Sequence, residues 1–216
     1  MKIQWLGHSC FRLEESTGTS IIIDPYHPYV GYEMPRVTAD VVTMSHGHKD
    51  HSYLGNIDGN PQILDKAGFY EVGGVHMYSQ KSYHDDAKGT KRGENLIFKY
   101  RLDGVDICHM GDIGEECNPM LVEKLMPIDV LMIPVGGTYT IDAEQAKEYI
   151  DRLMPDIVLP MHYKTKDCEF DIDRLDNFLD LFDEKDIIYM DTDTLEYDRA
   201  DFDGQDTKIV ILEKPN

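Results

Sequence analysis

The stretch Thr43–Tyr53, "TMSHGHKDHSY", places three histidines and an aspartate within six positions, directly after the apolar run "DVVTM". His46 and His48 are two residues apart, so an extended chain projects both side chains to the same side. Asp50 and His51 are adjacent and should reach a slightly different point. Neutral imidazoles are common ligands of zinc-like ions, and carboxylates also bind them. The cluster therefore suggests two neighbouring metal ions; the simpler alternative is a polar turn rich in histidine.

Apolar runs before and after this cluster predict the β-structure. In the first half, "KIQWLG", "CFRLEE", "SIIIDP" and "ADVVTMSH" are short, apolar or alternating, and are separated by turn residues. Later runs such as "NLIFKYRL", "VDICHMGD", "IDVLMIPVGG", "DIVLPMHY" and "KIVILEK" predict further strands. The irregular segment Pro25–Arg36, "PYHPYVGYEMPR", is rich in aromatic residues. It is interpreted either as the wall of a site or as a loop packed over its own aromatic side chains.

Helices are predicted mainly in the second half. "NPMLVEKLMP" offers Asn118 as an N-cap, followed by Pro119 at the first helical position. "DAEQAKEYIDRLMP" has Asp142 as an N-cap and Gln145 three residues later, close to a capping box. Apolar residues at helical intervals predict a third helix over residues 172–182. Strands followed by alternating helices and strands favour a layered α/β sandwich, in one domain spanning residues 1–216.

Composition narrows the class of protein. The 216 residues carry a formal net charge of -20, which repels phosphate backbones and anionic lipid, so nucleic acid and membranes are poor partners. No apolar run approaches the roughly 20 residues that span a bilayer, and the N-terminus lacks a signal-peptide pattern. None of the four cysteines forms a C-x-x-C pair, which suggests reduced thiols in a cytoplasm. The stretch 198–206, "DRADFDGQD", is interpreted as an acidic turn.

Three further candidate ligands each stand just past the apolar run of a predicted strand. His84 follows "GVHMYS", Asp112 ends "VDICHMGD", and His162 lies at the end of "DIVLPMHY". Each residue alone is more often a local polar group than a ligand. Their shared position favours a common site, and a carboxylate such as Asp112 can bridge two ions.

The order of these residues resembles the metallo-β-lactamase superfamily. The resemblance lies in "SHGHKDH", in Asp24 at the end of "IIID", and in His84, Asp112 and His162 as they follow along the chain. "WLGHSCFRLE", "MGDIG", "LMIPVGGTYTID" and "VLPMHYKT" resemble its small single-domain branch of metal-dependent hydrolases, similar to the ascorbate-6-phosphate lactonase type. The implied fold is a four-layer αββα sandwich with the site at one edge between the sheets.

The resemblance also implies a ligand set for two divalent ions. One ion would be held by His46, His48 and His84, the other by Asp50, His51 and His162, with Asp112 bridging and Asp24 orienting the histidine-rich loop from the second shell. Zinc is the first expectation, and manganese, iron, nickel or cobalt also suit histidine and carboxylate ligands.

The metals imply a hydrolase in which a metal-bridged hydroxide attacks a small-molecule ester, lactone or phosphoester, while the metals stabilise the oxyanion. Asp50 would carry the proton to the leaving group. One alternative is a ribonuclease or phosphodiesterase of the tRNA-processing type, which the acidic charge disfavours. A di-iron redox protein is a further alternative. It is disfavoured because members of that type resemble the motif His-x-Glu-x-Asp-His, whereas this chain has His48 at the third position of the motif. A non-catalytic metal-binding module is the remaining alternative.

Other side chains are candidates for secondary roles. His8, in "LGHSC", is expected either to support the site from the second shell or its wall, or to be a structural histidine near a turn. Possible contacts to substrate are hydroxyls that could donate to an oxyanion and cations that could meet an anionic group. These are Tyr139 and Tyr163, and Arg92, Lys91 and Lys164.

Overall fold

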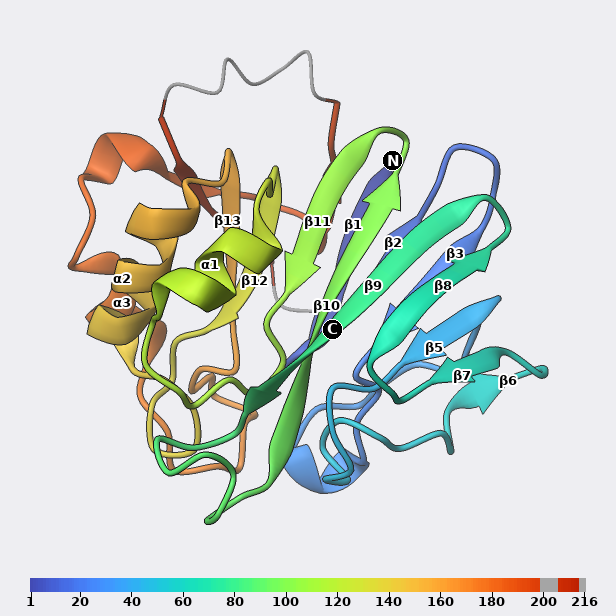
Figure 1. The fold of residues 1–216 in the computed structure, drawn as a ribbon, viewed down its shortest axis with the longest axis horizontal. Coiled ribbons are helices and arrows are strands. Elements are labelled where there is room, and N and C mark those ends of the chain that lie inside the picture. The colour runs from blue at the N-terminus through green and yellow to red at the C-terminus, as the bar shows by residue number, and fades with distance from the viewer. Residues whose placement is uncertain (199–205, 214–216) are drawn as a thin grey trace.

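The computed structural model describes residues 1–198 and 206–213, whose strands form two large sheets packed face to face (Figure 1). In spatial order the first sheet contains β15 (Thr194–Glu196), β1 (Lys2–Gly7), β2 (Cys10–Glu14), β3 (Ser20–Ile23), β5 (Val41–Thr43) and β7 (Gln62–Leu64). The second contains β14 (Ile187–Tyr189), β16 (Lys208–Ile211), β13 (Ile157–Met161), β12 (Val130–Pro134), β11 (Val105–His109), β10 (Glu94–Leu102), β9 (Val75–Tyr83) and β8 (Gly68–Val72). β4 (Val37–Thr38) pairs with β6 (Ile57–Asp58). Most of the acidic turn predicted at 198–206 lies outside the described residues.

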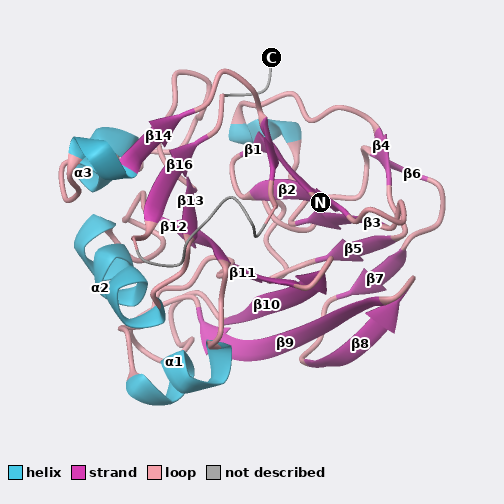
Figure 2. Ribbon diagram, turned by 90° about the horizontal axis from the view of Figure 1, so that it is seen from above, coloured by secondary structure: helices cyan, strands magenta, loops and turns pink. Residues whose placement is uncertain are grey.

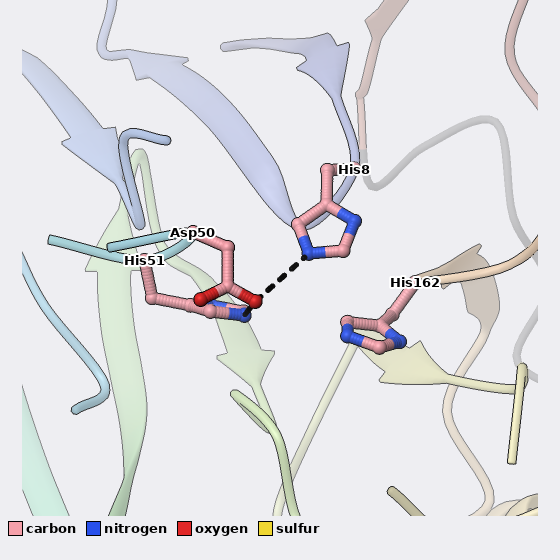
Figure 3. Close-up of side chains that lie close together, drawn as sticks. All are labelled: His8, Asp50, His51 and His162. Atoms are coloured by element: carbon pink, nitrogen blue, oxygen red, sulfur yellow. Dashed lines mark ion pairs between the residues drawn. The ribbon is translucent and has the colours of Figure 1, made fainter. Parts of the chain in front are cut away.

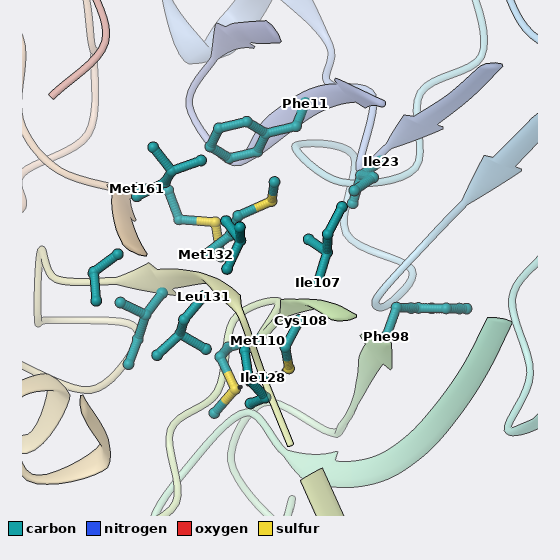
Figure 4. Packing of buried hydrophobic residues seen from close by; sticks show 14 of the residues in the cluster. Phe11, Ile23, Phe98, Ile107, Cys108, Met110, Ile128, Leu131, Met132 and Met161 are labelled. Atoms are coloured by element: carbon teal, nitrogen blue, oxygen red, sulfur yellow. Dashed lines mark hydrogen bonds between the residues drawn. The ribbon is translucent and has the colours of Figure 1, made fainter. Parts of the chain in front are cut away.

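Alternation along the strands of the first sheet divides its side chains between two layers of core. Ile21 and Ile23 of β3 face the second sheet and join one buried cluster with Ile107 and Met132; Figure 4 shows part of this packing. Ile22, between them, points the other way into a smaller buried cluster. All three isoleucines of β3 are buried because both faces of the strand are covered.

The two outer surfaces of the sandwich are covered differently. α1 (Pro119–Leu125), α2 (Ala143–Leu153) and α3 (Leu175–Leu179) lie against the second sheet (Figure 2). The outer face of the first sheet is covered by the aromatic loop with its 3-10 turn η1 (Pro28–Val30), and by side chains from the 168–172 segment. The predicted sandwich is confirmed. Within the described residues, however, the layer over the first sheet is loop rather than α-helix, because Tyr26 and Tyr32 supply its apolar cover.

Local capping explains the two helices that the sequence predicted well. The Asn118 side chain accepts a hydrogen bond from the backbone N–H of Leu121, and Pro119 begins α1. At α2, Asp142 accepts from the N–H of Gln145, and the Gln145 side chain accepts from the N–H of Asp142. Both motifs satisfy donors that a helix N-terminus leaves free.

The structure differs from the prediction in one helix and in several short strands. α3 begins only at Leu175, and η2 (Glu184–Asp186) is a separate turn, so the helix predicted over 172–182 is too long. The preceding segment is held by tertiary contacts instead: Asp173 N–H donates to the carbonyl of Gly136, and Ile172 is buried against the first sheet. β4, β6, β7 and β8 were not predicted, since they are short or exposed; Phe69 of β8 is 84% exposed.

Parallel pairing brings the ends of several strands to one edge of the sandwich. β5 lies between β3 and β7, with both pairings parallel, and β12 lies parallel between β11 and β13. The residues that follow β3, β5, β11 and β13 therefore meet where the two sheets adjoin.

Among the described residues, no helix has the length and apolar character needed to cross a membrane.

Candidate metal centre

Asp24 organises the histidine-rich loop from below. It follows β3, is fully buried, and accepts hydrogen bonds from the backbone N–H of Ser45 at 2.7 Å and from the Ser45 hydroxyl at 2.5 Å. Its Oδ2 also lies 2.8 Å from Nδ1 of His51. With Nδ1–H donated to this carboxylate, His51 keeps the lone pair on Nε2 for a metal, which is the usual arrangement behind a metal-binding histidine.

The same network sets the orientation of His46. The Ser45 hydroxyl donates its proton to Asp24, so it can only accept from Nδ1 of His46, which lies 2.9 Å away. The Nε2 atom of His46 is then left with its lone pair, buried and without a hydrogen-bond partner. A single carboxylate therefore prepares two imidazoles of the loop as ligands.

The predicted ligands from distant strands meet around Asp112. Its Oδ2 lies 3.1 Å from Nε2 of His51, 3.4 Å from Nε2 of His84 and 3.5 Å from Nε2 of His162. Nε2 of His46 is 3.9 Å away. The loop after β11 is held by Asn95, whose Oδ1 accepts from the backbone N–H of Asp112. Asp112 thus occupies the central position expected of a bridging carboxylate.

Two groups of possible metal-binding atoms adjoin each other at this point. The first group comprises His46, His48 and His84, and the second group comprises His8, Asp50, His51 and His162; within each group the ligand atoms all lie within 4.8 Å of one another. Figure 3 shows the second group converging on a common point. A third set, His46, His51 and Asp112, links the two groups. All seven candidates from the sequence are brought together, and His8 is added to them.

The donor set fits divalent cations because it leaves buried polar atoms without partners. Within the described residues, buried atoms lacking a hydrogen bond include Nε2 of His46 and of His51, Nδ1 of His84 and of His162, Oδ1 of Asp112 and both ring nitrogens of His8. An unpaired buried polar group costs about 1–3 kcal/mol, so native proteins leave few of them. Because these unpaired atoms gather in one place, they point to bound cations, which the polypeptide alone does not supply.

The electrostatics favour neutral imidazoles around ionised carboxylates. Burial lowers the pKa of His46 to about 3 and that of His162 to about 4. Burial alone would raise the pKa of Asp112, but the surrounding histidines outweigh it and the pKa is lowered well below its usual value. At neutral pH these groups are therefore in the forms that bind cations. His51 is the exception: burial lowers its pKa, but Asp112 and Asp24 raise it further than burial lowers it. An ion at Nε2 of His51 would therefore compete with a proton for that nitrogen.

A cavity of about 270 Å³ opens directly onto the cluster. Besides metal-binding candidates, its lining includes four larger side chains: Tyr29, Arg92, Tyr139 and Phe170. The Tyr29 hydroxyl donates to Oδ1 of Asp50 at 3.0 Å. A larger hollow of about 480 Å³ lies on the second sheet near Phe69. Among the described residues, however, each group of possible metal ligands contributes at least one side chain to the lining of the smaller cavity.

The predicted substrate contacts divide into two sets. Arg92 and Tyr139 line the cavity, with the guanidinium carbon 5.5 Å from the centre of the tyrosine ring. Tyr163 is buried and packs on Trp5, with ring centres 5.7 Å apart, beside a different small pocket. Lys164 donates through Nζ to the backbone carbonyl of Phe170, so it holds the segment that carries a lining residue.

Two lining residues were missed by sequence reasoning, and Lys91, like Tyr163 and Lys164, does not line the cavity. The aromatic loop did signal a site wall, but nothing singled out Tyr29 within it, and Phe170 stands in a segment without a motif. Lys91 pairs with Asp86 on the surface. His8 does not support a ligand from behind by a hydrogen bond; its ring lies within the second group itself.

Comparisons with known proteins bear on the family of this chain. The family model described as "Beta-lactamase superfamily domain" matches residues 2–162. Metal-dependent hydrolases from Carboxydothermus hydrogenoformans and Methanospirillum hungatei are 27% and 30% identical to this chain, covering 76% and 77% of it and 85% and 84% of their own lengths.

A solved structure extends the likeness to the whole chain. It is described as a candidate Zn-dependent hydrolase of the metallo-β-lactamase superfamily from Thermotoga maritima; it is 39% identical, has a TM-score of 0.82, and matches over 99% of both chains. The family model, these relatives and the fold lead to one assignment: this chain belongs to the metallo-β-lactamase superfamily and is one of its metal-dependent hydrolases.

Proposed function

We propose that this hydrolase uses two divalent ions, with zinc as the first expectation, to cleave a small-molecule ester, lactone or phosphoester. The observation that carries this is the pair of ligand groups on either side of Asp112, both opening onto one cavity. His46, His48 and His84 would hold one ion, and Asp50, His51 and His162 the other. Such ions supply Lewis-acid activation of a water molecule and of the bond to be cleaved.

The chain's own residues would position the reactants and move the proton. Asp50 lies at the cavity with one carboxylate oxygen fixed by the Tyr29 hydroxyl. Its other oxygen faces the second group, 3.7 Å from Nε2 of His51. Asp50 would accept the proton of the attacking water and return it to the leaving group. Phe170, which packs against the rings of Tyr29 and Tyr139, would exclude bulk water.

The cavity also suggests the chemistry of the substrate. A volume of about 270 Å³ suits a small molecule and not a folded polymer. Arg92 brings a cation to the rim of a site in a strongly acidic protein, held there by a hydrogen bond to the carbonyl of Thr138 and by the face of Tyr139. A guanidinium pairs with carboxylate or phosphate through two parallel hydrogen bonds. We therefore infer a substrate that carries an anionic group away from the bond that is cleaved.

The test is a panel of lactones, esters and phosphoesters, each with and without a carboxylate or phosphate substituent, offered to protein loaded with zinc or manganese. Hydrolysis of one class, preferably of its anionic member, is expected, with loss of turnover in His48→Ala. Metal-loaded protein that turns over no member would favour a non-catalytic role. Filter binding with tRNA is expected to be negative; binding and cleavage of tRNA would instead favour the ribonuclease alternative.

A further inference from the structure

His8 is a buried histidine that the seven-ligand set leaves without a role. It lies in the tight turn between β1 and β2, with a left-handed backbone (φ +52°). Its carbonyl accepts a hydrogen bond from Nε1 of Trp5 at 3.0 Å. Non-glycine residues seldom adopt this conformation unless the surroundings impose it. The direction of the His8 side chain is therefore set by the fold before any ligand binds.

That direction leads into the second group. The His8 residue is 1% exposed, and neither of its ring nitrogens has a hydrogen-bond partner among the described residues. Its ring centre lies 4.4 Å from that of His162 (Figure 3). The nearest carboxylate atom, Oδ2 of Asp50, is 3.8 Å from Nε2, too far for a hydrogen bond. A structural histidine at such a site would be expected to satisfy at least one nitrogen.

The separations fit a shared cation better than direct contacts. Two atoms that each lie about 2.1 Å from one ion cannot be more than about 4.2 Å apart. Oδ2 of Asp50 is 3.8 Å from Nε2 of His8 and 3.7 Å from Nε2 of His51. Side-chain shifts of a few tenths of an ångström would bring the whole second group, whose ligand atoms lie within 4.8 Å of one another, within this limit.

We propose that His8 is a ligand, through Nε2, of the ion held by Asp50, His51 and His162. This rests on the two-ion centre proposed above and makes that centre unequal. Of the second group, Asp50 and His162 line the cavity and His8 and His51 do not; of the first group, His48 and His84 line it. With His8, the second group would offer its ion four protein ligands in addition to Asp112, whereas the first group would offer three and leave a position open toward the cavity.

The test measures metal binding and does not depend on turnover. Metal-free wild type, His8→Gln and His8→Asn would be titrated with Zn²⁺ against a competing chelator, and bound metal counted by elemental analysis. Asparagine tolerates the left-handed backbone, so it covers the case in which glutamine prevents folding. His76→Gln, which removes an exposed histidine far from the cluster, is the matched control. Loss of His8 is expected to lower the binding affinity for one of the two ions by about tenfold or more and to leave the affinity for the other unchanged.

A Co²⁺ titration identifies the ligand directly. In cobalt-loaded wild type, the exchangeable ring proton of each coordinated histidine gives a hyperfine-shifted proton NMR signal. One such signal should vanish in His8→Gln and persist in His76→Gln. Two ions bound with equal affinity by wild type and by both His8 variants, with an unchanged cobalt spectrum, would overturn the role of His8 while leaving the two-ion centre intact. A wild type that binds a single ion would instead overturn the two-ion centre and this inference together.

Discussion

Replacing Asp24 with asparagine tests the hydrogen bonds behind the candidate metal ligands without changing any of those ligands. Asparagine keeps the shape but puts an NH₂ group where one carboxylate oxygen stood. In the wild type, Oδ2 receives protons from the Ser45 hydroxyl at 2.5 Å and from His51 Nδ1 at 2.8 Å. The hydroxyl can rotate and accept from the new amide. In the variant, Nδ1–H of His51 would face the NH₂ group, so two donors would oppose each other. The conflict disappears only if the ring proton moves to Nε2, and the proton then occupies the lone pair that the metal needs.

The magnitude follows from these contacts. Substitutions behind a metal-binding histidine cost about 10- to 100-fold in metal affinity, which is about 1.4–2.7 kcal/mol. Because a hydrogen bond to a charged acceptor contributes about 1.5–3 kcal/mol, the metal-free protein should also lose about that much unfolding free energy. The assays are chelator competition for the second ion and urea denaturation of the metal-free protein.

A matched control lies at the opposite end of the same strand pair, β3 and β5. Asp40 also accepts from the backbone N–H and the hydroxyl of one serine, Ser20, but touches no metal-binding candidate. Asp40→Asn should lower stability modestly and leave metal affinity as in the wild type. Equal metal affinity in Asp24→Asn and Asp40→Asn would refute the idea that Asp24 fixes the ring proton of His51.

Three further changes test the cavity and its loops. Arg92→Gln should raise KM for anionic substrates about 10- to 100-fold, with little change in kcat or in the hydrolysis of neutral analogues; equal effects on both substrate types would contradict the pairing. Tyr29→Phe removes the hydrogen bond to Asp50 and should lower kcat about tenfold or more, with metal content unchanged by elemental analysis. Burial would raise the pKa of Asp85, but backbone N–H donors including that of Arg92 lower it from 3.8 to about 2. Its carboxylate therefore stabilises the fold above about pH 4, and that contribution is lost as the pH falls through about 2. Asp85→Asn should be less stable than wild type at pH 6, and denaturation curves of the two should converge toward pH 2; a constant difference down to pH 2 would count against this.

Local sequence patterns were sufficient where the deciding interactions are themselves local. The capping box of Asp142 and Gln145 joins residues three apart, and local hydrophobicity is enough to predict the apolar strands. The third predicted helix failed because tertiary hydrogen bonds and burial of Ile172 compete with its helical spacing. The burial of the edge strand β8 alternates, but its exposed positions include Phe69, so the sequence does not alternate between polar and apolar residues.

By itself, the sequence determined the kind of protein and most of the candidate metal-binding cluster. Four candidate ligands follow β5 on one short loop. Asp112 and His162 follow β11 and β13, whose parallel pairing through β12 brings them to one edge. His84 follows β9, which runs in the same direction as β11 because both pair antiparallel with β10. Only the tertiary structure decided which side chains surround the cluster. Phe170 and Tyr29 reach it from loops without a motif, and His8 enters through a left-handed turn between β1 and β2. The reason is physical: strand ends obey the geometry of a sheet, whereas the direction of a loop side chain depends on everything packed around it.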